Sequence, residues 1–154
     1  MPPPERSFGF LLYDSARLLR RDFDRRARTI GLTRAQWSVI SHLARYEGVN
    51  QAALADLMEI QPITLVRLLD RLEEAGWIVR GADPKDRRSR VPHLTDKARP
   101  VIEKLQALAA QTRELALIGI DAEERERLLD ALQKIRTNLS SREDDAGKTG
   151  TDGG

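Results

Sequence analysis

The sequence contains no cysteine among its 154 residues. This absence excludes a structural disulfide, a thiol redox switch and a metal site made of thiolates, and it suits the reducing cytoplasm, where we expect the protein. Histidine is also scarce: His42 and His93 are the only two, and no dense group of Asp, Glu and His joins them. We therefore expect neither a metal site nor a cofactor.

Aromatic residues and long apolar runs are scarce as well, with only 5% of the chain aromatic. Beta-rich folds usually carry more aromatic residues, so 40% hydrophobic and 32% charged residues indicate a helix-rich soluble protein. The apolar runs are far shorter than a membrane span, and residues 1–6 are not followed by the apolar h-region of a signal peptide. We expect one compact domain behind a flexible leader, residues 1–6.

Helical spacing of apolar residues predicts a first amphipathic helix over residues 7–29. Its arginines can form a solvated helix face or contact DNA, and we favour the solvated face. Thr33 and Gln36 form a capping-box pattern that begins a second helix, which should end near Gly48. On that helix we expect four residues to point inward: Trp37, Ile40, Leu43 and Ala44.

The middle of the chain predicts a helix-turn-helix. Asn50 can cap a short helix over 51–57, and Leu54, Leu57 and Met58 should be buried. After a turn at residues 59–61, Pro62 suits the first position of a helix over 62–75, because its φ is already helical and it has no N–H to leave unpaired. One face of this helix is apolar, and the other is suited to base edges or phosphates. The apolar face contains Leu65, Leu68, Leu69 and Leu72, and the other contains Ile63, Thr64, Arg67 and Arg71.

A basic hairpin should follow, with strands over 77–80 and 90–94 around a loop over 81–89. Pro92 cannot donate a ladder hydrogen bond, so its nitrogen should face an open sheet edge. The net charge of the chain is only +2, but residues 80–99 contain seven basic and three acidic residues, a local excess of +4. Such a local patch matters more for binding nucleic acid than the total charge does.

Two further helices are expected, one after Thr95 as far as about Leu117 and one from Asp121 to about residue 140. The fold class is therefore mainly α, a winged helix-turn-helix with a small β-wing. We divide the chain into a leader (1–6), an N-terminal dimerisation helix (7–30), the DNA-binding domain (31–95), C-terminal dimerisation helices (96–140) and a disordered tail (141–154), whose composition is too polar to fold.

Four motifs, in this order and at these spacings, resemble the MarR family of winged-helix regulators, particularly its SlyA-like branch. They are Leu32-Thr-Arg-Ala-Gln-Trp37, Ile60-Gln-Pro-Ile-Thr-Leu-Val-Arg67 with Leu72-Glu-Glu-Ala-Gly76, Asp83-Pro-Lys-Asp-Arg-Arg88, and Leu94-Thr-Asp-Lys-Ala98. Ala98 and Glu59 depart from the family pattern, which often has glycine at the first position and glycine or a small residue at the second. The resemblance implies a transcriptional regulator that binds double-stranded DNA.

The resemblance also implies a homodimer whose first, fifth and sixth helices interlock. The long C-terminal helices carry more apolar surface than one small lobe can cover, which agrees with a dimer. Two-fold symmetry predicts an inverted-repeat site with half-sites about one helical turn apart.

The DNA-binding candidates lie on the fourth helix and the wing. On the helix we choose Gln61, Thr64 and Arg67 for the major groove, with Pro62 setting the geometry of the helix start and Arg71 on the same exposed side. In the wing, the family pattern pairs Asp86 with Arg88: the carboxylate braces the loop and neighbouring guanidinium groups, and Arg88 enters a narrow minor groove. Phosphate contacts are assigned to Arg87 and Arg90. The alternative is a solvated charged hairpin without a binding role. We disfavour it when the hairpin is considered together with the fourth helix.

Family members commonly sense small aromatic or phenolic anions in a cleft between the DNA lobe and the dimerising helices. Here the candidates are Tyr13, Arg17, Trp37 and His42, although we favour a packing role for each. The absence of cysteine excludes peroxide sensing through a thiol. The family's common outcome is repression, often relieved by an effector, and we take it as the default.

Two other classes remain to be weighed. An enzyme is disfavoured, because the sequence has no glycine-rich phosphate loop, no nucleophile motif and no paired acidic motif beyond charges that helix caps and faces explain. A winged-helix module that binds protein, or an activator or countersilencer without ligand response, is the other alternative. Arg67 and Arg88 argue against a module that has lost DNA binding.

Overall fold

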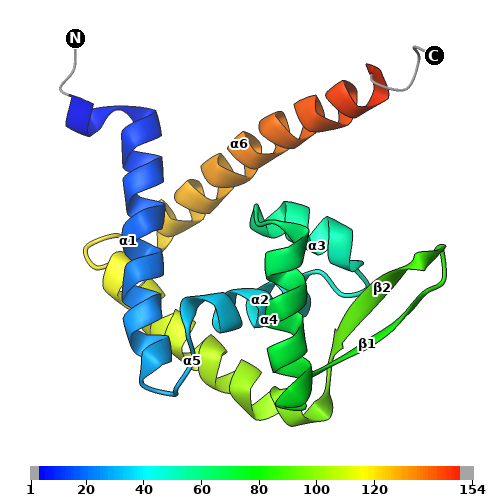
Figure 1. Cartoon of the computed structure of the whole chain (residues 1–154). Coiled ribbons are helices and arrows are strands. Elements are labelled where there is room, and N and C mark those ends of the chain that lie inside the picture. The colour runs from blue at the N-terminus through cyan, green and yellow to red at the C-terminus, as the bar shows by residue number, and fades with distance from the viewer. Residues whose placement is uncertain (1–3, 150–154) are drawn as a thin grey trace. The chain divides into compact units, whose positions relative to one another are not determined.

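The computed structural model describes residues 4–149, with side chains for residues 5–146 (Figure 1). The described part contains six α-helices, two short 3-10 helices and one antiparallel sheet of two strands. The chain divides into two compact units, Met1–Arg113 and Glu114–Gly154. The elements in order are η1 (Pro4–Arg6), α1 (Phe8–Arg28), α2 (Arg34–Arg45), α3 (Gln51–Met58), α4 (Pro62–Glu74), β1 (Ile78–Asp83), β2 (Asp86–Leu94), η2 (Asp96–Ala98), α5 (Arg99–Ala116) and α6 (Ala122–Thr149).

The helix starts follow the capping residues that the sequence predicts. Asn50 Oδ1 accepts a hydrogen bond from the backbone N–H of Ala53 and so caps α3. At α2 the predicted capping box is present: Thr33 Oγ1 accepts from the N–H of Gln36, and Gln36 Oε1 accepts from the N–H of Thr33. Pro62 occupies the first turn of α4, as predicted.

The turn between α3 and α4 contains a backbone conformation that L-residues seldom adopt. Glu59 has φ 54° and ψ 42°, in the left-handed region, and it is the only non-glycine residue of the described chain with positive φ. A side chain in this region costs about 1–2 kcal/mol relative to ordinary helical backbone. The strain persists because α3 and α4 pack against each other on either side of the turn.

The core lies where α2, α3, α4 and the base of the wing meet. Leu65, Leu69 and Leu72 on α4 are almost completely buried, and so are Leu54 on α3 and Ile40 on α2. Because all three leucines project from one side of α4, the opposite side of this helix faces solvent. The packing thus fixes which residues of α4 are available to a partner.

Two predictions of burial are wrong. Ala44 is exposed, because α2 turns Val39, Ile40 and Leu43 inward instead, and Val39 had not been expected there. Leu57 is exposed too, since the short α3 buries Leu54 and Ala55 while Met58 is only half-buried. The buried side of α3 is set by the elements packed against it, α2, α4 and β2, and Leu57 lies outside that side.

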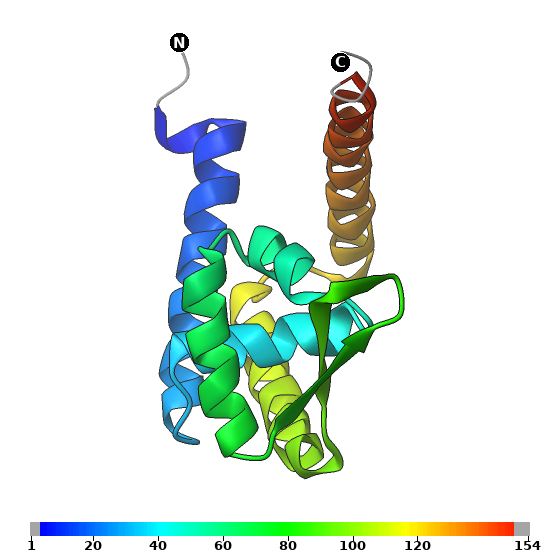
Figure 2. The same cartoon turned by 45° about the vertical axis from the view of Figure 1, so that its right-hand side comes forward.

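The wing is longer than the sequence predicted. We expected strands over 77–80 and 90–94, but β1 and β2 continue to a turn at Pro84 and Lys85 (Figure 2). Asp83 stabilises this turn, because its Oδ1 accepts from the backbone N–H of Lys85 at 2.9 Å. Polar, basic composition made this segment look like a loop, but backbone pairing requires no apolar side chains. Pro92 pairs with Arg80 in the register and is buried.

Polar contacts join α1 to α5. Thr112 Oγ1 donates to Asp22 Oδ2 at 2.8 Å, and Arg26 donates both to Asp22 Oδ2 and to Gln111 Oε1, each at 2.8 Å. The hydrogen bond from Arg26, then that from Thr112, hold the pKa of the Asp22 carboxyl below its ordinary value, against the opposing effect of desolvation. Thr112 is the only polar residue among the buried side chains of the described chain.

In the second unit, α6 begins where predicted and ends later. Asp121 Oδ1 accepts from the N–H of Glu124, while Arg125 donates to the carbonyl oxygens of Leu117 and Ile120. We expected disorder from residue 141, but the helix continues to Thr149; residues 150–154 of the predicted tail lie outside the described residues. Once a helix has formed, each added residue gains a backbone hydrogen bond without needing apolar burial.

No helix within residues 4–149 combines the length and the apolar character needed to cross a membrane.

We predict that Asp22→Asn lowers the free energy of unfolding by about 1–2 kcal/mol at pH 7, because the charged hydrogen bonds that join α1 to α5 are lost. The lowered pKa means that Asp22 stabilises the fold fully above its ordinary value of 3.8 and loses this contribution as the pH falls through the folded-state pKa. Urea unfolding of both proteins at pH 7 and near pH 3 should therefore show the difference shrinking in acid.

The matched control is Asp14→Asn. Among the described residues Asp14 pairs only with Arg17, three residues along the same helix, so its replacement should cost about 0.5 kcal/mol or less. Equal losses in the two variants, or a difference that persists in acid, would contradict the role given to Asp22.

Candidate nucleic-acid interface

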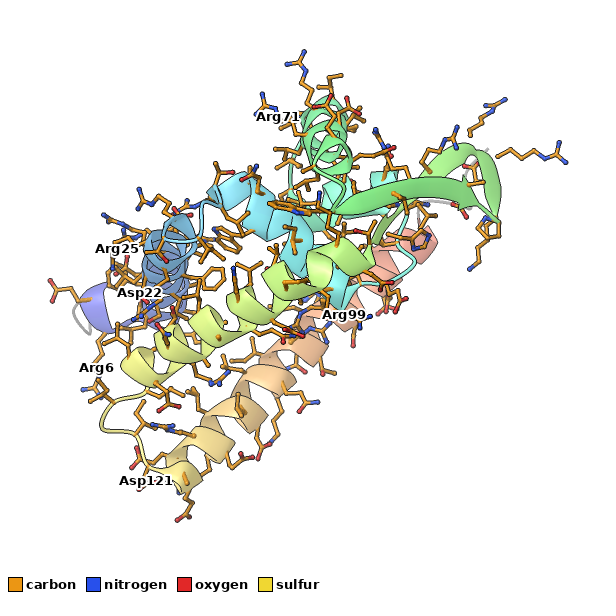
Figure 3. All side chains as sticks on the ribbon, turned by 90° about the horizontal axis from the view of Figure 1, so that it is seen from below. Arg6, Asp22, Arg25, Arg71, Arg99 and Asp121 are labelled. Carbon is orange, nitrogen blue, oxygen red and sulfur yellow. The ribbon has the colours of Figure 1, made fainter. Side chains whose placement is uncertain are left out.

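The exposed side of α4 carries polar and basic groups. We call it the outer face; it consists of Gln61, Pro62, Thr64, Arg67 and Arg71, all exposed. Arg71 points away from the body of the unit in Figure 3. The five residues predicted at the start and along the exposed side of this helix are therefore all open to a partner, and none of them is needed to fill the core.

The start of α4 has free backbone donors. Gln61 is the N-cap residue, but its side chain makes no capping hydrogen bond. Its carbonyl oxygen accepts from the N–H of Leu65, so the N–H groups of Ile63 and Thr64 have no partner within the helix. Because Pro62 has no N–H, it leaves no additional donor unpaired. This end of α4 is therefore suited to a negatively charged group.

The wing presents its cations on an ordered hairpin. Asp86 Oδ1 accepts a hydrogen bond from the backbone N–H of Arg88 at 2.9 Å. The carboxylate thus braces the backbone, as the sequence predicts, although it pairs with no guanidinium group in the described chain. At the base of the tip, Asn50 Nδ2 donates to Asp83 Oδ2 at 3.4 Å and joins the wing to the start of α3.

Six cations of α4 and the wing have no acidic partner among the described residues. By contrast, Arg17, Arg25, Arg26 and Arg34 all pair with aspartates of α1. All six unpaired cations are exposed: Arg67, Arg71, Lys85, Arg87, Arg88 and Arg90. A surface that leaves this many positive charges uncompensated is suited to a polyanion.

Arg80 is a positioning residue that sequence analysis missed. From β1, its Nε donates to Glu73 Oε2 and its Nη2 donates to Asp70 Oδ1, both at 2.6 Å, so one guanidinium group fixes the wing to α4. Burial opposes the charged form, but the hydrogen bonds that Arg80 donates to Glu73 and Asp70 outweigh it and raise the pKa of Arg80. The signal in the sequence was the pair of acidic residues three apart on an otherwise basic surface.

The four candidate effector residues come from two helices. Tyr13 and Arg17 lie on α1, where Tyr13 is 67% exposed and Arg17 pairs with Asp14. Trp37 and His42 lie on α2 and are half-buried.

Both α2 residues have partners in the chain. Trp37 Nε1 donates to Asp24 Oδ1 at 2.9 Å, and its ring meets Phe23 edge-on at 4.6 Å between centroids. His42 Nδ1 lies 2.7 Å from the carbonyl oxygen of Ser38, and its ring stacks on Tyr46. These contacts give Trp37 and His42 packing roles.

Within residues 4–149, no three His, Asp or Glu side chains are grouped closely enough to hold a metal ion.

Comparison with known proteins identifies similar chains. A profile of the MarR family matches residues 30–89. The transcriptional regulator PA3341 is 39% identical, with a TM-score of 0.75, over 88% of this chain and 99% of that one. CouR from Rhodococcus jostii RHA1, solved bound to p-coumaroyl-CoA, is 29% identical, with a TM-score of 0.71, over 88% of this chain and 95% of that one.

A crystal structure of MarR shares the fold at 23% identity, with a TM-score of 0.80 over 94% of this chain and 99% of that one. The likeness to these structures confirms the predicted fold class, six helices with a small two-stranded sheet.

We predict that Arg80→Met loosens the attachment of the wing to α4. The variant should lose about 1 kcal/mol of unfolding free energy, since two well-aligned ion pairs are removed. Hydrogen exchange at the backbone amides of β1 and β2 should become faster. Arg71→Met is the matched control, because Arg71 lies on α4, the helix that Arg80 contacts, and has no acidic partner among the described residues. Wing amides protected equally in both variants would show that Arg80 does not hold the hairpin.

Proposed function

Because this chain belongs to the MarR family of transcriptional regulators, we propose that it binds a specific double-stranded DNA site as a homodimer and represses transcription until an effector releases it. The family consists of transcription regulators rather than enzymes. We further place the chain in the SlyA-like branch of the family, on the four motifs in its sequence.

One observation carries the proposal: the outer face of α4 and the wing both present unpaired cations, and Arg80 joins the two elements. In helix-turn-helix proteins the second helix enters the major groove with its N-terminal residues near the base edges. A hairpin beside it can reach the neighbouring backbone or minor groove. Six unpaired cations on one surface repel one another, and a neutral partner would not offset that repulsion as the phosphates of DNA would.

Each candidate residue has a role that its chemistry suits. Arg67 can make paired hydrogen bonds to a guanine edge, whereas Gln61 and Thr64 adapt to more than one base. Arg71, farther along α4, is assigned to phosphate. In the wing, Asp86 holds the backbone so that Arg88 can enter a narrow minor groove, which attracts cations. We assign Arg87 and Arg90 to phosphates on either side.

The homodimer is supported by apolar residues that the single chain leaves exposed. In α1 these include Phe8, Phe10, Leu11, Leu12, Leu18 and Leu19, and in α6 they include Leu128, Leu129, Leu132 and Leu139. Side chains of this size are costly to leave in water, at about 1.5–3 kcal/mol each for full exposure. A two-fold axis would place two copies of α4 on one side of the duplex and select an inverted repeat.

Release by a small molecule requires that the effector bind unequally to two arrangements of the dimer. CouR, one of the similar proteins, was solved with p-coumaroyl-CoA, whose acyl group is phenolic. We propose an aromatic or phenolic effector for this chain as well. Exposed Tyr13 is better placed to meet it than Arg17, Trp37 and His42, which already have partners in the chain.

We predict that Arg88→Ala weakens DNA binding and lowers its dependence on salt. DNA for this test comes from selecting genomic fragments on the purified protein. If Arg88 displaces counterions, the slope of log K against log salt should fall by about one for each protomer. Arg127→Ala is the matched control, since it also removes an exposed arginine, one that lies on α6 and pairs with Glu123.

An unchanged affinity and slope for Arg88→Ala in a mobility-shift titration would remove Arg88 from the interface. A protein-only module would enrich no inverted repeat in the selection, and an activator would raise transcription from the selected promoters.

We predict that sedimentation equilibrium gives twice the 17.4 kDa mass of one chain. Leu132→Glu should lower the mass toward that of the monomer, because it buries a charge in the proposed apolar interface. Leu57→Glu is the control, since Leu57 is an exposed leucine on α3, a helix that contributes no residue to the proposed interface. A monomeric wild-type protein, or a Leu132→Glu dimer of unchanged stability, would contradict this surface.

A further inference from the structure

Ile63 is a large apolar side chain in the middle of a polar surface. It is 60% exposed, at the second residue of α4, and it takes no part in the hydrophobic core of the described chain. Its neighbours Pro62 and Thr64 are exposed as well. Isoleucine is not required for the helix here, since β-branched residues are slightly unfavourable in helices. Packing and helix propensity therefore leave the choice of isoleucine unexplained.

The position of Ile63 on α4 gives it a specific environment. Residues four apart lie one above the other on a helix, so Ile63 shares a side of α4 with Arg67. The leucines that bury the inner side, among them Leu65 and Leu69, point the other way. Ile63 is also in the first turn, the part of a recognition helix that lies closest to the base edges. It thus extends the outer face with an apolar group.

We propose that Ile63 reads the C5-methyl group of a thymine in the major groove. This inference rests on the proposed binding of α4 to DNA and adds an apolar contact to the hydrogen bonds assigned there. The thymine methyl is the one apolar group that base pairs present in the major groove, and aliphatic side chains recognise it by excluding water. Each half-site should therefore contain an essential A·T pair beneath the first turn of α4, oriented with its thymine toward Ile63.

Geometry favours a methyl group over a polar base atom as the partner. An isoleucine placed against the donors and acceptors of a G·C pair would remove their water without replacing the hydrogen bonds, which is unfavourable. Thr64, the adjacent residue, carries both a methyl and a hydroxyl group, so it can tolerate either kind of pair. Ile63 is the more selective residue. It contributes specificity by disfavouring a G·C pair as well as by attracting the thymine methyl group.

The test uses the DNA sequence selected by the wild-type protein. Each thymine of one half-site is replaced in turn by deoxyuridine, which keeps every hydrogen-bonding group and lacks only the methyl. We expect wild-type affinity to fall about fourfold at one thymine, the factor that corresponds to ~0.8 kcal/mol for one buried methyl or methylene group. Ile63→Ala should bind the thymine site more weakly and should not distinguish deoxyuridine from thymidine at that position.

Two further variants make the result specific. Ile63→Val keeps most of the apolar surface and should retain the sensitivity to deoxyuridine. Thr64→Ser removes the neighbouring methyl while keeping the hydroxyl, and it should also retain the sensitivity. Because Ile63 is exposed, all variants should melt at the wild-type temperature.

The outcomes separate this inference from the proposed function. If an inverted repeat is selected but no thymine is sensitive, or Ile63→Ala stays as sensitive as the wild type, the assignment to Ile63 is wrong while DNA binding stands. Loss of the sensitivity in Thr64→Ser alone would transfer the contact to Thr64 and overturn the proposal. If the protein selects no DNA sequence, both the proposed function and the assignment to Ile63 are wrong.

Discussion

Burial of Leu65, Leu69 and Leu72 on one side of α4 is the constraint on which the surface of this unit depends. Removing any one of these side chains would cost several kcal/mol, about 2–5 for a change to alanine. The rotation of α4 about its own axis is therefore fixed by the core, and so is the identity of the residues left outside. The polar groups of the outer face need no contacts of their own to orient them, because the buried leucines already fix the rotation of the helix that carries them.

The sequence predicted the helix starts well, because caps are local. Thr33, Asn50 and Pro62 each act within three or four residues of their own position, so their roles can be deduced without the fold. Burial was harder to predict. Leu57 and Ala44 match a helical pattern, yet the width of the buried stripe depends on neighbouring helices that no local pattern specifies. The longer wing strands and the extension of α6 were missed for a related reason, since hydrogen-bonded backbone can continue through polar residues.

The candidate site also has features that the sequence predicted and features that it did not. Unpaired cations could be anticipated from the excess of basic residues between residues 80 and 99, because nearby aspartates are too few to neutralise them. Arg80 lies in the same basic segment, yet it serves the opposite purpose, holding the wing to α4 through Asp70 and Glu73. The sequence alone cannot distinguish an unpaired cation from one in an ion pair, since the difference depends on which carboxylates the fold brings near. The DNA contacts and the effector residues stay predictions.

The absence of ion pairs to the exposed cations of α4 and the wing, within the described residues, also affects how quickly a DNA partner is found. Within the described part of the chain, the exposed arginines of α4 and the wing have no ion pair that must break before a phosphate is met. Their field is therefore available at a distance, within the roughly 8 Å over which charges act at physiological ionic strength. Electrostatic steering of this kind raises the rate of encounter more than it prolongs the complex. Asp86, by holding the hairpin in shape beforehand, leaves little rearrangement to slow the step that follows.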